Sequence, residues 1–99
     1  MAWRILRRKG AAPQKGTSGS FEIEQDGEIA HLDYRVSGDV MQLIHTEVPE
    51  KLAGKGLGSQ LAETALRWAR EHKLKVDIIC PFVKEYVARH PEYSDLIQK

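Results

Sequence analysis

The segment from residue 54 to residue 59 places glycines at alternate positions just before a helical pattern, in the order Gly54, Lys55, Gly56, Leu57, Gly58 and Ser59. Glycines let the backbone turn tightly and approach a ligand closely. The first N–H groups of a helix lack internal acceptors, and the helix dipole favours an anion beside them. The pattern predicts that main-chain amides bind a phosphate or pyrophosphate, supported by Lys55 and Ser59. The alternative is a glycine-rich turn that only connects strand and helix.

Two well-known phosphate-binding motifs do not fit this segment. A P-loop needs Ser or Thr directly after Gly-Lys, and here Gly56 follows Lys55. A dinucleotide-binding fingerprint needs Gly-x-Gly-x-x-Gly in a parallel unit, but residue 59 is Ser and the preceding strands are predicted to be antiparallel.

The single cysteine, Cys80, follows a short predicted strand and stands directly before Pro81, which suits the first position of a helix. A thiol at a helix N-terminus lies at the positive end of the dipole, which lowers its pKa and increases the thiolate fraction. Such a thiolate could accept an acyl group and pass it to an amine. The alternative is that Cys80 is a small buried apolar residue.

Three further side chains are candidates for acid–base chemistry. His45 and Glu47 alternate onto one face of a predicted strand, so both could point into the same cleft and deprotonate an ammonium substrate. A strand histidine can equally be a hydrogen-bonded core residue. Tyr86, one turn into the helix after Pro81, could reprotonate a leaving thiolate, or it could only pack on the apolar side of that helix.

The elements that must position these residues begin with three strands. Alternating apolar and polar residues predict strands at residues 21–25, 28–36 and 40–48, with turns at Asp26-Gly27 and at residues 37–39. Consecutive strands joined by tight turns form an antiparallel meander.

The second half of the chain changes to a helical period. It predicts a helix from Leu57 to about His72, a strand at residues 76–79, a helix from Pro81 and a final turn at residues 91–97. The predicted order is β-β-β-α-β-α, in which the last strand is parallel to a neighbour. The fold class is therefore α/β of the α+β kind: an antiparallel meander followed by β-α-β-α, with helices packed on a mixed central sheet.

The chain of 99 residues allows one domain with a modest core, which excludes a TIM barrel and a full dinucleotide-binding fold. Its composition, 41% hydrophobic and 29% charged with a net charge of +1, is that of a soluble globular domain. One cysteine excludes an intramolecular disulfide, and the scattered histidines form no structural zinc motif. Charged residues interrupt every apolar run, and no secretory leader is evident. We therefore expect a cytoplasmic protein without a metal site or a membrane partner.

The positive charge is concentrated at the N-terminus. Residues 1–20 carry five basic and no acidic side chains, whereas the rest carries ten basic and fourteen acidic ones. We expect residues 1–19 to form a flexible basic tail and residues 20–99 to form the folded domain. One alternative is a short edge strand around residues 3–6, and another is an arm that binds nucleic acid. The lack of interleaved aromatic residues argues against nucleic acid.

Several of these features together resemble a known family. Residues 45–49 (His-Thr-Glu-Val-Pro), the loop at residues 54–59 and Cys80 resemble the GNAT-type N-acetyltransferases, and more closely the minimal GNAT-like family. Members of that family are little more than the acetyl-CoA-binding half of the GNAT fold. The resemblance covers about residues 20–97.

The resemblance has one departure. The general GNAT signature is Arg or Gln, two residues, Gly, one residue, and Gly or Ala. Gly56 and Gly58 match the two small positions, but Ala53 stands where Arg or Gln is usual. Pyrophosphate binding would then rely on main-chain amides.

The resemblance also implies a cofactor and roles for individual residues. The cofactor is acetyl-CoA, whose pantetheine arm pairs with the backbone of the strand before the glycine loop. The matching residues here are Thr46, Glu47 and Val48, after which Pro49 removes one donor. Members of the minimal family carry a cysteine at the position of Cys80, which implies an acetyl-cysteine intermediate.

The function expected is therefore an acetyl-CoA-dependent N-acetyltransferase that acts on a primary amine, directly or through acetyl-Cys80. One alternative is a CoA- or acyl-CoA-binding module without catalysis, because so short a chain lacks the extra elements that build an acceptor wall. Another is association with nucleic acid through the basic tail. A monomer is expected, and the acceptor amine is not identified by the sequence.

Overall fold

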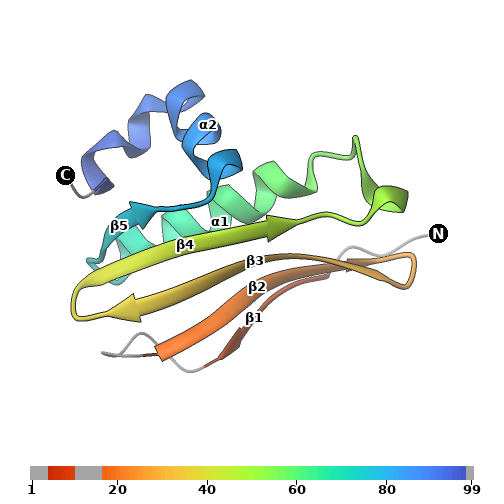
Figure 1. Ribbon diagram of the computed structural model, residues 1–99, viewed down its shortest axis with the longest axis horizontal. Coiled ribbons are helices and arrows are strands. Elements are labelled where there is room, and N and C mark those ends of the chain that lie inside the picture. The colour runs from red at the N-terminus through yellow and green to blue at the C-terminus, as the bar shows by residue number, and fades with distance from the viewer. Residues whose placement is uncertain (1–4, 11–16, 98–99) are drawn as a thin grey trace.

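The computed structural model describes residues 5–10 and 17–97 of the chain (Figure 1). In chain order the elements are β1 (Ile5–Gly10), β2 (Thr17–Gln25), β3 (Glu28–Ser37), β4 (Val40–Glu47), the 3-10 helix η1 (Glu50–Leu52), α1 (Leu57–Glu71), β5 (Lys75–Ile78), α2 (Pro81–Arg89) and the 3-10 helix η2 (Pro91–Leu96). The predicted order β-β-β-α-β-α is confirmed, with one more strand before it. No helix within the described ranges is long and apolar enough to span a membrane.

The strands form one five-stranded mixed sheet in the order β1-β2-β3-β4-β5. Neighbouring strands are antiparallel except β4 and β5, which are parallel because α1 connects them. The β2–β3 turn has the predicted geometry, since Asp26 and Gly27 have φ angles of 54° and 77°. These left-handed values are those of a two-residue type I′ hairpin. The turn fixes the register of β2 and β3, which places His31 opposite Glu22.

The N-terminal segment differs from the prediction. Residues 5–10 pair antiparallel with β2, and β2 itself begins at Thr17 rather than at Phe21. The prediction of a flexible tail is therefore wrong for residues 5–10 and 17–19, because β1 and the start of β2 belong to the sheet. The edge-strand alternative is the one that the structure supports. Residues 1–4 and 11–16 of the expected tail lie outside the described residues.

One face of the sheet carries the core and is called the helix face here. Its fully buried strand residues alternate along β2, β3 and β4, and they are Phe21, Ile23, Ala30, Leu32, Tyr34, Val36, Met41 and Leu43. Against them α1 packs the apolar stripe that its sequence predicts, made of Leu57, Leu61, Ala62, Ala65, Leu66 and Ala69. Buried residues of α2 and η2 join the same cluster, so these helices also lie on the helix face (Figure 1).

The opposite face is called the open face. It carries the alternate residues of β2 and β3, among them Glu22, His31 and Asp33, which are only half-buried. No helix of the described residues contributes to a core on this side. The two faces therefore differ in chemistry: one is packed and apolar, and the other is solvated and rich in titratable groups.

Candidate functional site

β4 and β5 separate at their carboxyl ends. Their pairing stops at Leu43 and Ile78, where the Leu43 carbonyl accepts the N–H groups of both Ile79 (2.9 Å) and Cys80 (3.0 Å). β4 nevertheless continues to Glu47, still paired with β3 on its other side. No strand among the described residues pairs with this last part of β4. Its edge therefore offers backbone donors and acceptors that an extended ligand can use.

A β-bulge at Ile44 decides which side chains of β4 face which side. Leu43 lies opposite Tyr34 and His45 lies opposite Asp33, so Ile44 has no opposite residue. Without the extra residue, His45 would share the helix face with Leu43, because side chains alternate along a strand. The bulge instead turns Thr46 to the helix face and leaves His45 on the open face.

Thr46 and Cys80 form the polar contact on the helix-face side of this opening. Cys80 is the N-cap residue of α2, with Pro81 in the first helical turn as predicted. Its side chain is buried, with 3% of the residue exposed, and Sγ lies 3.3 Å from the Thr46 hydroxyl oxygen. Cys80 is thus both a buried residue and a potential nucleophile at a helix N-terminus.

The pKa of the Cys80 thiol is lowered from its ordinary value. Burial acts to raise the pKa, but hydrogen bonds from the Thr46 hydroxyl and from the N–H groups of Val83, Phe82 and Thr46 stabilise the thiolate and lower it. The expected direction of the shift is confirmed. Its cause is a set of individual donors in the first turn of α2 and on β4.

The glycine-rich segment forms the turn into α1. Gly54 and Gly56 have φ angles of 80° and 76°, which other residues rarely adopt. Gly56 is the N-cap of α1 and has no side chain to cap the helix, and the first turn contains no acidic residue. Among the described residues, no backbone carbonyl accepts the N–H groups of residues 57–59. These amides are therefore available to an anion.

Gly58 serves a different purpose from the other two glycines. A Cβ at this position would lie 2.8 Å from Cζ of Phe82, so glycine lets the aromatic ring sit directly on the first turn of α1, and a larger residue would make the ring move. The contact brings the starts of α1 and α2 together. Leu57 is buried in the core, and only its backbone faces the turn. Phe82, which the sequence did not single out, is thus part of the site.

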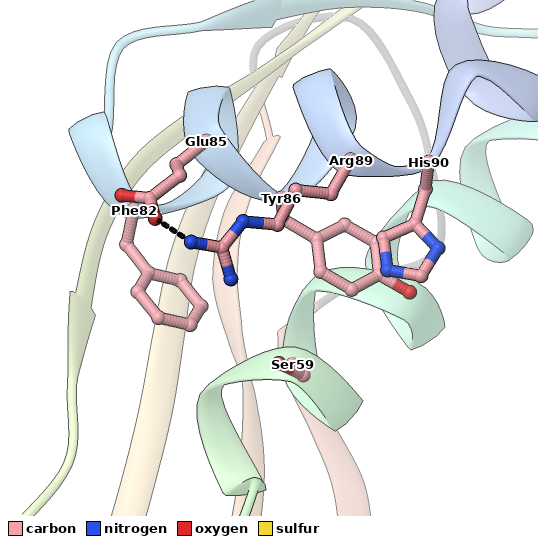
Figure 2. A pocket seen from close by; sticks show the side chains of 6 residues that line it. All are labelled: Ser59, Phe82, Glu85, Tyr86, Arg89 and His90. Carbon is pink, nitrogen blue, oxygen red and sulfur yellow. Dashed lines mark hydrogen bonds and ion pairs between the residues drawn. The ribbon is translucent and has the colours of Figure 1, made fainter.

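A small cavity of about 110 Å³ lies between α1 and α2 (Figure 2), and it is lined by Ser59, Phe82, Glu85, Tyr86, Arg89 and His90. The Tyr86 and His90 rings stack with their centroids 4.1 Å apart, and Arg89 pairs with Glu85 at 2.7 Å. Burial, followed by the nearby Glu63 carboxylate, raises the pKa of Tyr86. Its hydroxyl is therefore a hydrogen-bond donor at neutral pH.

The remaining predicted binding residues lie at the ends of the same elements. Lys55 forms an ion pair with Asp26 of the β2–β3 turn at 3.6 Å, and both side chains are partly exposed. Val48 follows β4 and packs partly buried against the core. A larger open groove of about 490 Å³ lies elsewhere, along the exposed side of α1, and is lined by Arg67, Arg70, Glu71, Glu92 and Tyr93. None of the predicted site residues lines it.

His45 and Glu47 share one face of β4, as expected, and His45 Nε2 lies 3.4 Å from Glu47 Oε1. That face is the open one, so the expectation that both side chains enter the cleft beside Cys80 is corrected. The bulge places them on the side of β4 opposite to the Thr46 side chain. His45 is also well exposed, which excludes the alternative of a core histidine.

Sequence reasoning missed a second pair on the open face. On β3, His31 Nδ1 lies 3.0 Å from Asp33 Oδ1, and His31 Nε2 lies 4.0 Å from Glu47 Oε1. The alternation of His31 and Asp33 was visible in the sequence. Their approach to Glu47 was not, because it depends on the β3–β4 register and its bulge.

Comparison with known proteins gives a consistent result. The family model described as GCN5-related N-acetyl-transferase matches residues 20–96. The chain is 34% identical over 96 residues to "Protein NATD1" of Mus musculus, a match covering 81% of this chain and 87% of that protein. It is 36% identical over 83 residues to the protein of the same name from Gallus gallus, covering 79% and 76%. The Homo sapiens protein is 34% identical over 83 residues, covering 79% and 74%.

Proposed function

Because the chain belongs to the GCN5-related N-acetyltransferase family, we propose that it transfers the acetyl group of acetyl-CoA to a primary amine. The observation that carries the proposal is the separation of β4 from β5 beyond Leu43. The open edge of β4, the Cys80 thiol and the start of α1 lie around it. An acyl donor bound there would be held by backbone groups and would have a thiol nearby.

The residues at this opening fit the chemical parts of CoA. The amides of residues 57–59 have no internal acceptor, and the absence of an acidic residue in the first turn of α1 leaves them suited to a pyrophosphate. The backbone of β4 from Thr46 onward suits the amide groups of pantetheine. Lys55 and the Ser59 hydroxyl are the proposed side-chain contacts, and Lys55 would exchange its ion pair with Asp26 for the phosphate. What CoA supplies when bound is an acetyl group activated as a thioester.

For direct transfer, the protein must remove a proton from the acceptor and stabilise the thioester oxygen. Glu47 and His45 on the open face are the proposed bases. N–H groups at the separated strand ends are the proposed donors to the oxygen. Tyr86, protonated at neutral pH, is a further candidate to protonate the leaving sulfur.

Transfer through Cys80 is the second route. The Sγ thiolate would attack the acetyl carbon, a new C–S bond would form, and the bond to the CoA sulfur would break. The acceptor amine would then attack acetyl-Cys80 and release the thiolate. The lowered pKa of Cys80 supports this route, because it increases the fraction of the nucleophilic form.

Binding is tested by isothermal titration with acetyl-CoA and with CoA. Gly54→Ala and Gly38→Ala form a matched pair, because both glycines have positive φ angles and open space around the missing Cβ. We expect similar losses of stability in both variants, but weakened CoA binding only in Gly54→Ala. No heat of binding to the wild type at about 1 mM ligand, the upper range of common KM values, would contradict the proposed function.

The covalent route is tested by intact mass after incubation with acetyl-CoA. We expect an added acetyl group that is absent in Cys80→Ala. If no adduct forms and Cys80→Ala retains the wild-type turnover, Cys80 is a structural residue and transfer is direct.

A second candidate function is a CoA-binding module without catalysis. The placement of His45 and Glu47 favours it, because both proposed bases lie on the face of β4 opposite to the Thr46 hydroxyl and the Cys80 thiol. Binding of CoA without consumption of acetyl-CoA above the buffer rate, across polyamine, amino-acid and lysine-peptide acceptors, would favour this candidate over the transferase.

A further inference from the structure

Four titratable side chains form a connected line across β3 and β4 on the open face. His31 Nδ1 contacts Asp33 Oδ1 at 3.0 Å, and His31 Nε2 faces Glu47 Oε1 at 4.0 Å. His45 Nε2 lies 3.4 Å from the same Glu47 oxygen. The two imidazole rings stand 6.2 Å apart, with Glu47 in contact with both.

The contacts of His31 give its two nitrogens different roles. A carboxylate at Nδ1 favours the tautomer in which Nδ1 carries the hydrogen and donates it to Asp33. The lone pair of Nε2 then lies on the side of Glu47, so this nitrogen can accept a proton from that carboxyl group. Asp33 stabilises the imidazolium that results.

The surroundings of His31 reinforce this arrangement. Glu22 on β2 lies directly opposite His31, and Glu47 lies opposite it on β4. With Asp33 beside it on β3, His31 therefore has an acidic neighbour on each of the three strands, and His45 is the other imidazole that faces it. Among the described residues, no group of three or more His, Cys, Asp or Glu side chains has the geometry to hold a metal ion. The cluster is therefore better suited to protons than to a metal.

We propose that His31, oriented by Asp33, is the last residue of a proton relay. It accepts the proton that the base Glu47 removes from the acceptor amine during acetyl transfer. The inference rests on the proposed function and extends it to two residues of β3. His31 acts through Glu47 and not on the substrate, so it is a positioning and relay residue. Its side chain is 29% exposed, which lets the relay return its proton to water.

The proton and bond changes balance as follows. One N–H bond of the acceptor ammonium breaks and its proton goes to Glu47. Because Glu47 Oε1 and His31 Nε2 are 4.0 Å apart, a proton then passes to Nε2 through one water molecule between them. The free amine forms a C–N bond with the acetyl carbon while the C–S bond breaks. A second proton leaves the nitrogen with the sulfur, which departs as a thiol. His31 then releases its proton to solvent.

The relay is tested with His31→Gln, and His72→Gln is the matched control because His72 is an exposed histidine bonded to the Trp68 carbonyl at the end of α1. Turnover is measured over a pH series with spermidine, an amino acid and a lysine peptide as acceptors. We expect kcat of His31→Gln to fall about tenfold at neutral pH, the lower part of the range for proton transfer. KM for acetyl-CoA should not change. The deficit should disappear in alkaline buffer, where the amine is already deprotonated.

Two further variants separate the relay from a general loss of structure. Asp33→Asn keeps the side-chain shape but removes the charge that stabilises the imidazolium, and we expect a smaller fall of kcat with the same pH dependence. Imidazole added to His31→Ala should restore part of the rate, and it should not affect His72→Ala. Both effects would be absent if His31 only stabilised the sheet.

The outcomes distinguish the relay from the function that it serves. If the wild type is active and His31→Gln has the rate and pH profile of His72→Gln, the relay is overturned and the transferase stands. If the wild type transfers acetyl to none of the amines, the transferase and the relay are both overturned. A pH-dependent loss with imidazole rescue supports the relay.

Discussion

The two sides of β4 beyond its bulge carry different chemistry. On the helix face, the Thr46 hydroxyl contacts the buried Cys80 thiol at the start of α2. On the open face, His45 and Glu47 are exposed and meet His31 on the neighbouring strand. One side is suited to hold an acyl group away from water, and the other is suited to exchange protons with water. The unpaired edge of β4 beyond Leu43 separates these two sides.

The comparison shows how one inserted residue organises a small domain. Because of the bulge at Ile44, the Thr46 side chain lies on the helix face, whereas the side chains of His45 and Glu47 lie on the open face. The sheet itself separates them. If the two faces are independent, a substitution on one of them should leave the chemistry of the other unchanged.

The largest effect should come from the packed face. Leu43→Ala removes a fully buried side chain, whereas Ile44→Ala truncates its neighbour in the bulge, which is 38% exposed. We expect a loss in the free energy of unfolding of about 3 kcal/mol for Leu43→Ala and under about 1 kcal/mol for Ile44→Ala. Urea denaturation measures both. Equal losses would mean that the bulge is packed as tightly as the core.

Gly58→Ala should give the next largest effect. The new Cβ would stand 2.8 Å from the Phe82 ring, so α2 must shift or the ring must move. We expect a loss of only about 1 kcal/mol, because the Phe82 ring is 44% exposed and can move aside, and alanine favours the helix more than glycine does. In the background of Phe82→Ala, the same change should cost far less, because the clash is removed. If the double-mutant cycle shows no coupling, the Phe82 ring does not fix the spacing of α1 and α2.

The framework of this site could be predicted from the sequence, since local signals specify it. The Asp26-Gly27 turn, the alternation of the three central strands and the helical stripe from Leu57 each depend on neighbouring residues alone. The glycine loop and Cys80 further indicated the family that the comparisons support. In these regions, local preference and tertiary structure agree.

What the sequence did not indicate depends on partners that are distant along the chain. The sequence offered a strand around residues 3–6 only as an alternative to a tail, and pairing with β2 is what makes residues 5–10 a strand. The bulge at Ile44 has no glycine or proline to mark it, so the separation of Thr46 from His45 was not foreseen. The contact of His31 with Glu47 follows from that register. The role of Gly58 likewise appears only when Phe82 packs against it.

A smaller effect should separate the thiol from the open face. Thr46→Val removes a hydroxyl that stabilises the Cys80 thiolate, so the pKa of the thiol should rise toward its ordinary value. Alkylation of Cys80 by iodoacetamide at neutral pH should slow about fivefold, the equivalent of one hydrogen bond of about 1 kcal/mol. The difference should vanish in alkaline buffer, where both variants are thiolates. His45→Ala should alkylate like the wild type, and slowing in that variant would show that the faces are coupled.

The smallest effect should be on stability at the open face. Glu47→Gln keeps the side-chain shape and removes the charge that faces His45 and His31 at 3.4 and 4.0 Å. Because these side chains are exposed or half-exposed, water screens their attraction, and such pairs contribute little to folding. We expect the free energy of unfolding to change by less than about 0.5 kcal/mol, while acetyl transfer falls sharply. A loss of stability comparable to that of Leu43→Ala would mean that the open face supports the fold, and its titratable groups would then need no function in proton transfer.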